Sequence, residues 1–115
     1  MDNIENGKIT SVFFGIEDHG CMTLYLQLEG KSWGCGFGGY QLLGADGSGM
    51  YAIKKLLETF DVQDLYSLNG KFVRVKWLND SRSCGNKIIS IGDIIEDKWF
   101  DWEMAFSEFN ERYDT

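Results

Sequence analysis

The sequence predicts a single α+β domain with a mainly antiparallel, strongly bent sheet of five or six strands, one central helix and a C-terminal helix. Short segments in which apolar and polar residues alternate predict the strands. Two segments with helical periodicity, near 48–60 and from about 101 onwards, predict the helices. At 115 residues and 43% hydrophobic content the chain can bury one core, so we expect residues 1–115 to form one domain.

The first strands are predicted in the N-terminal third. Residues 8–16 are rich in β-branched and aromatic side chains, which is typical of a strand covered on both faces. The polar residues 17–20 end in glycine and predict a hairpin turn. Residues 22–28 then alternate cleanly and predict a half-buried strand, whose inward face carries Met22, Leu24, Leu26 and Leu28. With the segment that follows, they would form a three-stranded meander.

That next segment, 33–38, alternates large side chains with glycine. Trp33, Cys35 and Phe37 would share one face, and the other face would be bare. We expect a helix or another strand to lie close against this bare face. A second glycine cluster, 44–49, leads into a helical stripe of Met50, Ile53, Leu56, Leu57 and Phe60, with Ser48 as its expected N-cap.

Glycine-rich turns before helices can bind phosphate, because backbone N–H groups and the helix dipole favour an anion there. If the bare face and this turn line a pocket, we expect a nucleotide-like ligand. The turn lacks the G-K-[ST] ending of a P-loop, and Asp46 would repel a phosphate. Glycine needed only for backbone geometry is the alternative. The ligand-binding candidates are Gly36, Gly38, Gly39, Tyr40 and Ser48.

The second half continues with turns, strands and a helix. Residues 61–68 suit a helical turn capped by Asp61, and Asn69 with Gly70 is a strong turn signal. Residues 71–78 predict a strand with Val73, Val75 and Trp77 inward and with Arg74 and Lys76 facing solvent or lying at an edge. A polar loop is expected at 79–86, and the strand 87–91 would continue through 94–95 after a bend at Gly92. The final helix is expected to begin at Asp101, its N-cap, with the stripe Trp102, Phe106, Phe109 and Tyr113.

The net charge of −7 is concentrated at the C-terminal end. Residues 93–115 hold eight acidic and two basic side chains, a net of −6, and the preceding 92 residues hold 10 acidic and 9 basic ones, a net of −1. Direct nucleic-acid binding is therefore not expected, because backbone contacts need clustered Lys and Arg. Six carboxylates are candidates for binding a basic partner: Glu96, Asp97, Asp101, Glu103, Glu108 and Glu111. The alternative is an amphipathic helix that packs on the sheet, with its carboxylates merely solvated.

No recognisable catalytic or metal motif is present, so we expect a protein that is not an enzyme and has no metal or cofactor. His19, the single histidine, could join Glu96 and Asp97 in a metal site or act as a base, but it sits in a polar turn without ligand spacing. The three cysteines match no zinc pattern and are expected to be free thiols. The N-terminal residues carry no signal-peptide pattern, and no apolar run is long enough to span a membrane, so we expect a cytoplasmic protein.

Five motifs together resemble a family of small, uncharacterised bacteriophage and prophage proteins. They are G-I-E-D-H-G (15–20), G-F-G-G-Y (36–40), L-L-E-T-F (56–60), L-N-G-K-F-V-R-V (68–75) and I-G-D-I-I-E-D-K-W-F-D (91–101). The resemblance covers most of the chain from 9 to 101 and implies a phage accessory role without an established activity. Two features depart from the family pattern: L-L-G follows Gln41 in place of an acidic residue, and the acidic aromatic tail after Asp101 is an extension.

These observations lead to one main functional hypothesis and two alternatives. The main hypothesis is a non-enzymatic phage or prophage protein that acts in the host cytoplasm and inhibits a host defence macromolecule, as an anti-CRISPR-like or other anti-defence factor. Its partner would be a host protein or nucleoprotein with a basic surface, and the sequence is also compatible with a homodimer. The alternatives are a small-ligand binder that sequesters a nucleotide signal, and an enzyme or metal protein that uses His19.

Overall fold

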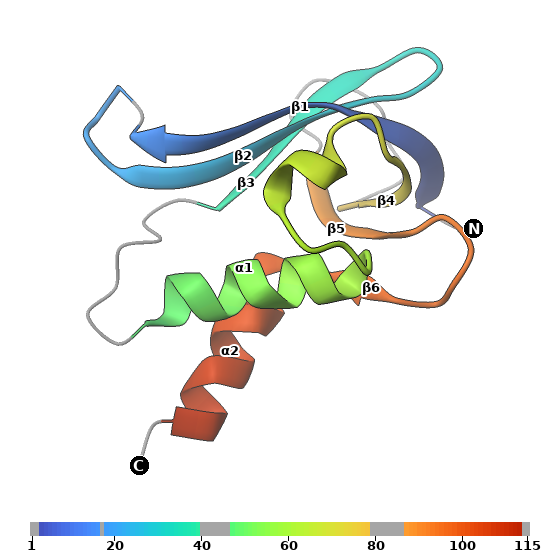
Figure 1. Cartoon of the computed structure of the whole chain (residues 1–115). Helices are drawn as coiled ribbons and strands as arrows, with labels where there is room; N and C mark the ends of the chain where they lie inside the picture. Colours follow the sequence, from blue (N-terminus) through green and yellow to red (C-terminus); the bar gives the residue numbers. More distant parts are fainter. Residues whose placement is uncertain (1–2, 17, 40–46, 79–86, 114–115) are drawn as a thin grey trace.

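The computed structural model describes residues 3–16, 18–39, 47–78 and 87–113. It confirms an α+β domain with one six-stranded antiparallel sheet in the order β3-β2-β1-β4-β5-β6 and two helices on one side of it (Figure 1). The elements are β1 (Ile4–Ile16), β2 (Met22–Glu29), β3 (Gly34–Gly39), α1 (Ser48–Thr59), the 3-10 helix η1 (Leu65–Leu68), β4 (Phe72–Trp77), β5 (Ile88–Asp93), β6 (Trp99–Phe100) and α2 (Trp102–Tyr113). No helix in these ranges is long and apolar enough to cross a membrane.

The longest strand, β1, belongs to both halves of the sheet. Its N-terminal part pairs with β4, from Ile4 opposite Lys76 to Lys8 opposite Phe72. Its C-terminal part pairs with β2 as far as Ile16 opposite Met22, after an irregularity between Ile9 and Ser11. Because the two partners flank different parts of one strand, the sheet bends around β1. The sequence prediction began this strand four residues too late, since the polar residues before Lys8 show no strand pattern.

The core confirms the alternation in β4 and, from Leu24 onwards, in β2, whereas Met22 is only half-buried and Thr23 is buried. Leu24, Leu26 and Leu28 are fully buried, as are Val73 and Val75. From α1 the core receives Ala52, Ile53, Leu56 and, just past the helix end, Phe60. The predicted meander is also confirmed, because β3 pairs antiparallel with β2 at the sheet edge.

Helix α1 corrects two details of the sequence prediction. Its N-cap is Gly47, which has a φ of 87° and makes no side-chain capping bond, so Ser48 is the first helical residue. Met50 is 68% exposed. The buried stripe is instead Gly49, Ala52, Ile53 and Leu56. Two small residues within it allow the helix to lie close to the sheet, and this turns Met50 towards solvent.

Further corrections concern the second half of the chain. Asp64, not Asp61, caps η1 by accepting a 2.9 Å bond from the Ser67 N–H. Asp61 instead has a φ of 53°. Strand β5 runs straight through Gly92 and ends at Asp93, so residues 94–95 form a turn rather than a strand. Strand β4 lies between β1 and β5, which excludes the predicted edge position for Arg74 and Lys76. The two-residue strand β6 is too short to show periodicity, and the predicted loop 79–86 lies outside the described residues.

Candidate functional site

Helix α2 begins where the sequence predicts. Asp101 Oδ1 accepts a 2.6 Å hydrogen bond from the Met104 N–H, which is an N-cap contact. Trp102, in the first turn, lies 5.0 Å from the Phe100 ring centroid and 6.1 Å from that of Phe37. These aromatic contacts join the start of α2 to β6 and β3.

The rest of α2 packs on α1, through a contact centred on Glu108. The Tyr51 hydroxyl donates a 2.8 Å hydrogen bond to Glu108 Oε1, and Lys55 Nζ lies 3.3 Å from the same oxygen. The bond from Tyr51, followed by that from Lys55, lowers the pKa of Glu108, and the same bond raises the pKa of Tyr51. The rings of Tyr51 and Phe109 also meet, with centroids 5.6 Å apart. Glu108 therefore joins two helices and is not a free surface charge.

The turn between β5 and β6 holds several of the remaining carboxylates. Asp93 Oδ2 accepts hydrogen bonds from the N–H groups of Glu96 and Ile95, which lower the pKa of Asp93. Asp97 Oδ1 accepts a 3.0 Å bond from Trp99 Nε1. Glu96 lies 3.4 Å from Lys98 Nζ, as an exposed pair. Most charged side chains of this turn therefore form hydrogen bonds or ion pairs within the turn itself.

The six predicted partner-binding carboxylates therefore fall into two groups. Asp97, Asp101 and Glu108 are engaged in contacts that fold the turn, start α2 and join the helices. Glu96, Glu103 and Glu111 are exposed. Within the described ranges, the side chains of Glu103 and Glu111 form no hydrogen bond or ion pair. Of the second group, Glu103 and Glu111 are available to a partner without loss of internal contacts, whereas Glu96 would give up its exposed pair with Lys98.

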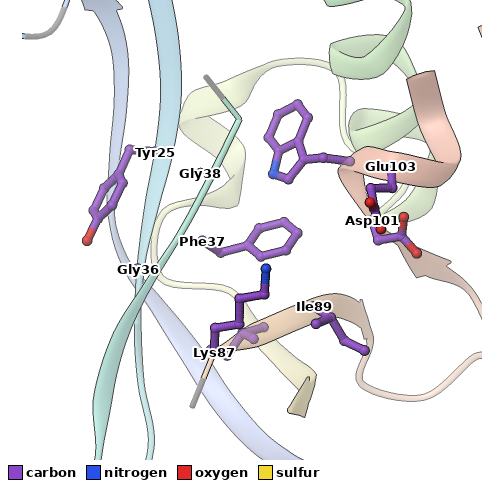
Figure 2. Close-up of a pocket in the computed structure, with 10 residues that line it drawn as sticks. Tyr25, Gly36, Phe37, Gly38, Lys87, Ile89, Asp101 and Glu103 are labelled. Carbon is purple, nitrogen blue, oxygen red and sulfur yellow. The ribbon is translucent and has the colours of Figure 1, made fainter. Parts of the chain in front are cut away.

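A cavity of about 410 Å³ lies where β3, β5 and the start of α2 meet. Figure 2 shows Phe37, Lys87, Asp101 and Glu103 on one side of β3, with Tyr25 on its other side. The described residues that line the cavity are Tyr25, Gly36, Phe37, Gly38, Lys87, Ile88, Ile89, Asp101, Trp102 and Glu103. One cation, two carboxylates and the Phe37 ring, which packs against Trp102, therefore lie on one side of β3, and Tyr25 borders the cavity from the other side.

The bare glycine face is covered in a way that the sequence did not predict. A Cβ atom on Gly36 would overlap the Tyr25 hydroxyl, and one on Gly38 would lie 3.2 Å from Tyr25 Cδ2. The covering group is thus a single side chain from the neighbouring strand, not a helix or another strand. An aromatic ring laid over a strand glycine supplies the packing that the glycine lacks.

The structure brings only part of the predicted ligand-binding set together. Gly36 and Gly38 line the cavity. Gly39 pairs with Leu24 at the end of β3. Ser48 starts α1 and is not part of the cavity wall. Tyr40 lies outside the described residues.

Two lining residues that sequence reasoning missed are Lys87 and Trp102. Trp102 Nε1 is buried and has no hydrogen-bond partner in the described ranges. A buried donor without an acceptor is unusual in folded proteins, so the cavity wall carries an unsatisfied hydrogen-bond donor at Trp102. The sequence signal was weak, because it shows an aromatic residue after an N-cap but not that residues 36–38, 87–89 and 101–103 converge.

The alternative that uses His19 receives no geometric support from the described residues. His19 lies in the exposed turn between β1 and β2, and neither Glu96 nor Asp97 belongs to that turn. No group of three His, Cys, Asp or Glu side chains in the described ranges is placed to hold a metal ion. Cys21 and Cys35 are half-buried thiols, and Cys84 lies outside those ranges.

The motif resemblance to small phage and prophage proteins stays a prediction from the sequence. No protein-family model matches the chain, and comparison with characterised proteins and with solved structures finds no match.

Proposed function

We propose that the protein is a non-enzymatic binding protein of a phage or prophage that docks on a basic surface of a host defence macromolecule and inhibits it. The observation that carries this proposal is the exposed, unpaired charge on α2. Glu103 and Glu111 face solvent without an internal partner in the described ranges. The phage origin and the host cytoplasm as its place of action rest on the motif resemblance alone.

The spacing of these carboxylates suits an extended basic surface. Eight residues separate Glu103 from Glu111, which is about 12 Å along a helix axis at 1.5 Å per residue. The successive 100° steps bring the two side chains within about 80° of each other around the helix. Both can therefore reach one partner surface at the same time, with Glu96 on the preceding turn as a further charge.

Charge reversal tests the docking surface. The variants Glu103→Lys and Glu111→Lys are expected to slow association with the partner by about tenfold together, because charges at an interface rim act mainly on the association rate. Affinity of the wild type should fall as the Debye length shrinks below about 8 Å at rising salt. The partner would be captured from host lysate, identified by mass spectrometry, purified, and measured by surface plasmon resonance at two salt concentrations.

The control for this experiment is Asp18→Lys, an equal charge change in the exposed β1–β2 turn. Glu108 is left unchanged, because its reversal would also break the contact with Tyr51 and Lys55. Thermal unfolding checks that each variant is folded. Affinity that is independent of salt, with full binding by the reversed variants, would place the interface elsewhere.

A second candidate function, the binding of a nucleotide signal, is favoured by the cavity. Its volume of about 410 Å³ falls in the usual range for ligand sites. The half-buried Trp102 ring offers a surface for a planar base, and Lys87 offers a cation for a phosphate. The carboxylates of Asp101 and Glu103 suit the amino groups of a base and disfavour a phosphate beside them.

We expect Gly36→Val to weaken nucleotide binding, because the new side chain displaces the Tyr25 ring at the cavity wall, while it changes stability by only about 1 kcal/mol, because this partly exposed ring can swing away. The matched control is Gly34→Val, where a new Cβ would meet its nearest neighbour at 3.6 Å, an ordinary contact. Isothermal titration calorimetry with purine mononucleotides and cyclic dinucleotides measures the effect. If the wild type binds none of them, this second function is wrong.

A further inference from the structure

Strand β1 extends beyond its pairing with β4. The pairing ends at Lys8, and the last backbone bonds on that side join Ile9 to Lys71 and Gly70. From there to Ile16, β1 pairs with β2 on one side. On the other side, no strand in the described part of the chain pairs with it. The hairpin of β1 and β2 projects away from the rest of the molecule (Figure 1).

The free edge lacks the features that normally protect an edge strand. Its residues read T-S-V-F-F-G-I and include no charge and no proline. The side chains of Phe13 and Phe14 are each 44% exposed and that of Ile16 is 71% exposed. Edge strands are usually blunted by lysine, proline or a bulge. The irregularity between Ile9 and Ser11 lies at the start of this edge, and from Ser11 to Ile16 the pairing with β2 is regular, without a bulge.

We propose that this edge pairs antiparallel with the same edge of a second copy, giving a two-fold dimer with one continuous sheet. An antiparallel pair of identical strands about a two-fold axis is self-complementary, since residue i of one copy faces residue j of the other and j faces i, and only a residue at the axis faces its own counterpart. The unpaired N–H and C=O groups of residues 10–16 then exchange hydrogen bonds between copies. Phe13 and Phe14 of the two copies meet near the axis.

Charge does not oppose a second copy at this edge. Two chains of net charge −7 repel each other over most of their surfaces. The segment 10–16 is a neutral strand on this acidic protein, so two copies can approach there without opposing carboxylates. The strand therefore suits an identical neutral strand better than it suits a strongly charged partner.

The available area is also sufficient. A groove of about 250 Å³ beside the edge is lined by Val12, Phe13, Phe14, Leu65 and Tyr66. Tyr66 is 88% exposed and stands at its rim. At about 200 Å² per large apolar side chain, the exposed fractions of Phe13, Phe14, Ile16 and Tyr66 offer roughly 500 Å² per copy. Complete burial of these side chains in both copies would remove at most about 1,000 Å², which is near the minimum for a specific interface.

This dimer is independent of the proposed docking function. Helix α2 lies across α1 from the hairpin, so its exposed carboxylates stay accessible in the dimer (Figure 1). The dimer depends on apolar contact and backbone hydrogen bonds, so we expect its affinity not to fall as the salt concentration rises. The affinity of α2 for its docking partner should fall under the same conditions. Failure of one proposal therefore leaves the other open to its own test.

Sedimentation velocity over a range of concentrations tests the dimer. The wild type is expected to form a dimer, and Phe13→Lys to weaken dimerisation by about tenfold or more, because the two lysines face each other across the axis. Ile16→Lys, at a more exposed position, should weaken dimerisation with less effect on the fold. The matched control is Phe72→Lys, which places the same change at a 61% exposed strand position opposite Lys8, outside residues 10–16, and should leave the dimer intact.

Amide hydrogen exchange provides the second measurement. Alternate amides between Ser11 and Ile16 should exchange more slowly at dimer-forming concentrations than in the dilute monomer. A wild type that stays monomeric at all concentrations would overturn the proposal and leave an extended peptide of another protein as the occupant of the edge. A dimer that withstands Phe13→Lys and Ile16→Lys but is lost in Phe72→Lys would overturn it as well.

Discussion

Replacing Phe100 with alanine is expected to lower the free energy of unfolding by about 3–5 kcal/mol, the usual cost of removing a buried aromatic ring. The Phe100 side chain is only 3% exposed. Its ring meets those of Phe37 and Trp102 edge-on, at centroid distances of 6.2 and 5.0 Å. The substitution would therefore loosen β3 at one sheet edge and α2 at the same time. Urea unfolding measures the loss, which corresponds to roughly 10–20 °C in Tm.

The control is Phe72→Ala, which removes an equal ring that is 61% exposed. Its only ring contact among the described residues is with Lys8 Nζ, 5.3 Å from the centroid, so about 1 kcal/mol or less should be lost. If Phe100→Ala costs no more than this control, the aromatic contacts between β3, β6 and α2 do not hold these elements together.

A second large effect is expected at Arg74, whose side chain fixes the turn between β5 and β6. Its Nε donates a 2.7 Å bond to the Asp93 carbonyl and its Nη2 a 2.8 Å bond to the Glu96 carbonyl. The guanidinium carbon also lies 4.7 Å from the Trp99 ring centroid. Arg74→Ala should cost about 1.5–3 kcal/mol, because hydrogen bonds from charged donors contribute that much.

Arg74→Lys separates geometry from charge. Lysine keeps the positive charge but cannot fork to two carbonyls, so we expect it to recover only part of the loss. Lys76→Ala is the control, because Lys76 also approaches the Trp99 ring, at 5.9 Å, from the same face of β4. Urea unfolding and amide exchange of residues 94–98 report the effect. Full stability in Arg74→Lys would show that charge alone holds the turn.

Much of the fold was predictable because its signals are local. The alternation of Leu24, Leu26 and Leu28 and that of Val73, Val75 and Trp77 reflect strands with one face in the core, and a period of two records this directly. Asp101 was predictable as an N-cap, because a short side-chain oxygen before a helical stripe is a local arrangement. At α1 the same rule favoured Ser48, whereas the preceding Gly47 has the positive φ and takes the cap position.

The candidate site was less predictable because it depends on contacts between distant segments. The sequence showed that Gly36 and Gly38 form a bare face, but not that Tyr25 covers it or that Lys87 and Trp102 stand nearby. In the sequence, Glu108 is only one of several carboxylates in an acidic tail. Its contacts with Tyr51 and Lys55 exist only because α2 folds back on α1, about half a chain length away.

The shared strand β1 also has a consequence for the order in which the chain folds. Ile16 pairs with Met22 within the same hairpin. Ile4 pairs with Lys76, which is synthesised much later. Closing the longer loop costs more chain entropy, and contacts distant in sequence form slowly. We therefore expect the hairpin of β1 and β2 to form first, and the arrival of β4 beside the start of β1 to set the folding rate.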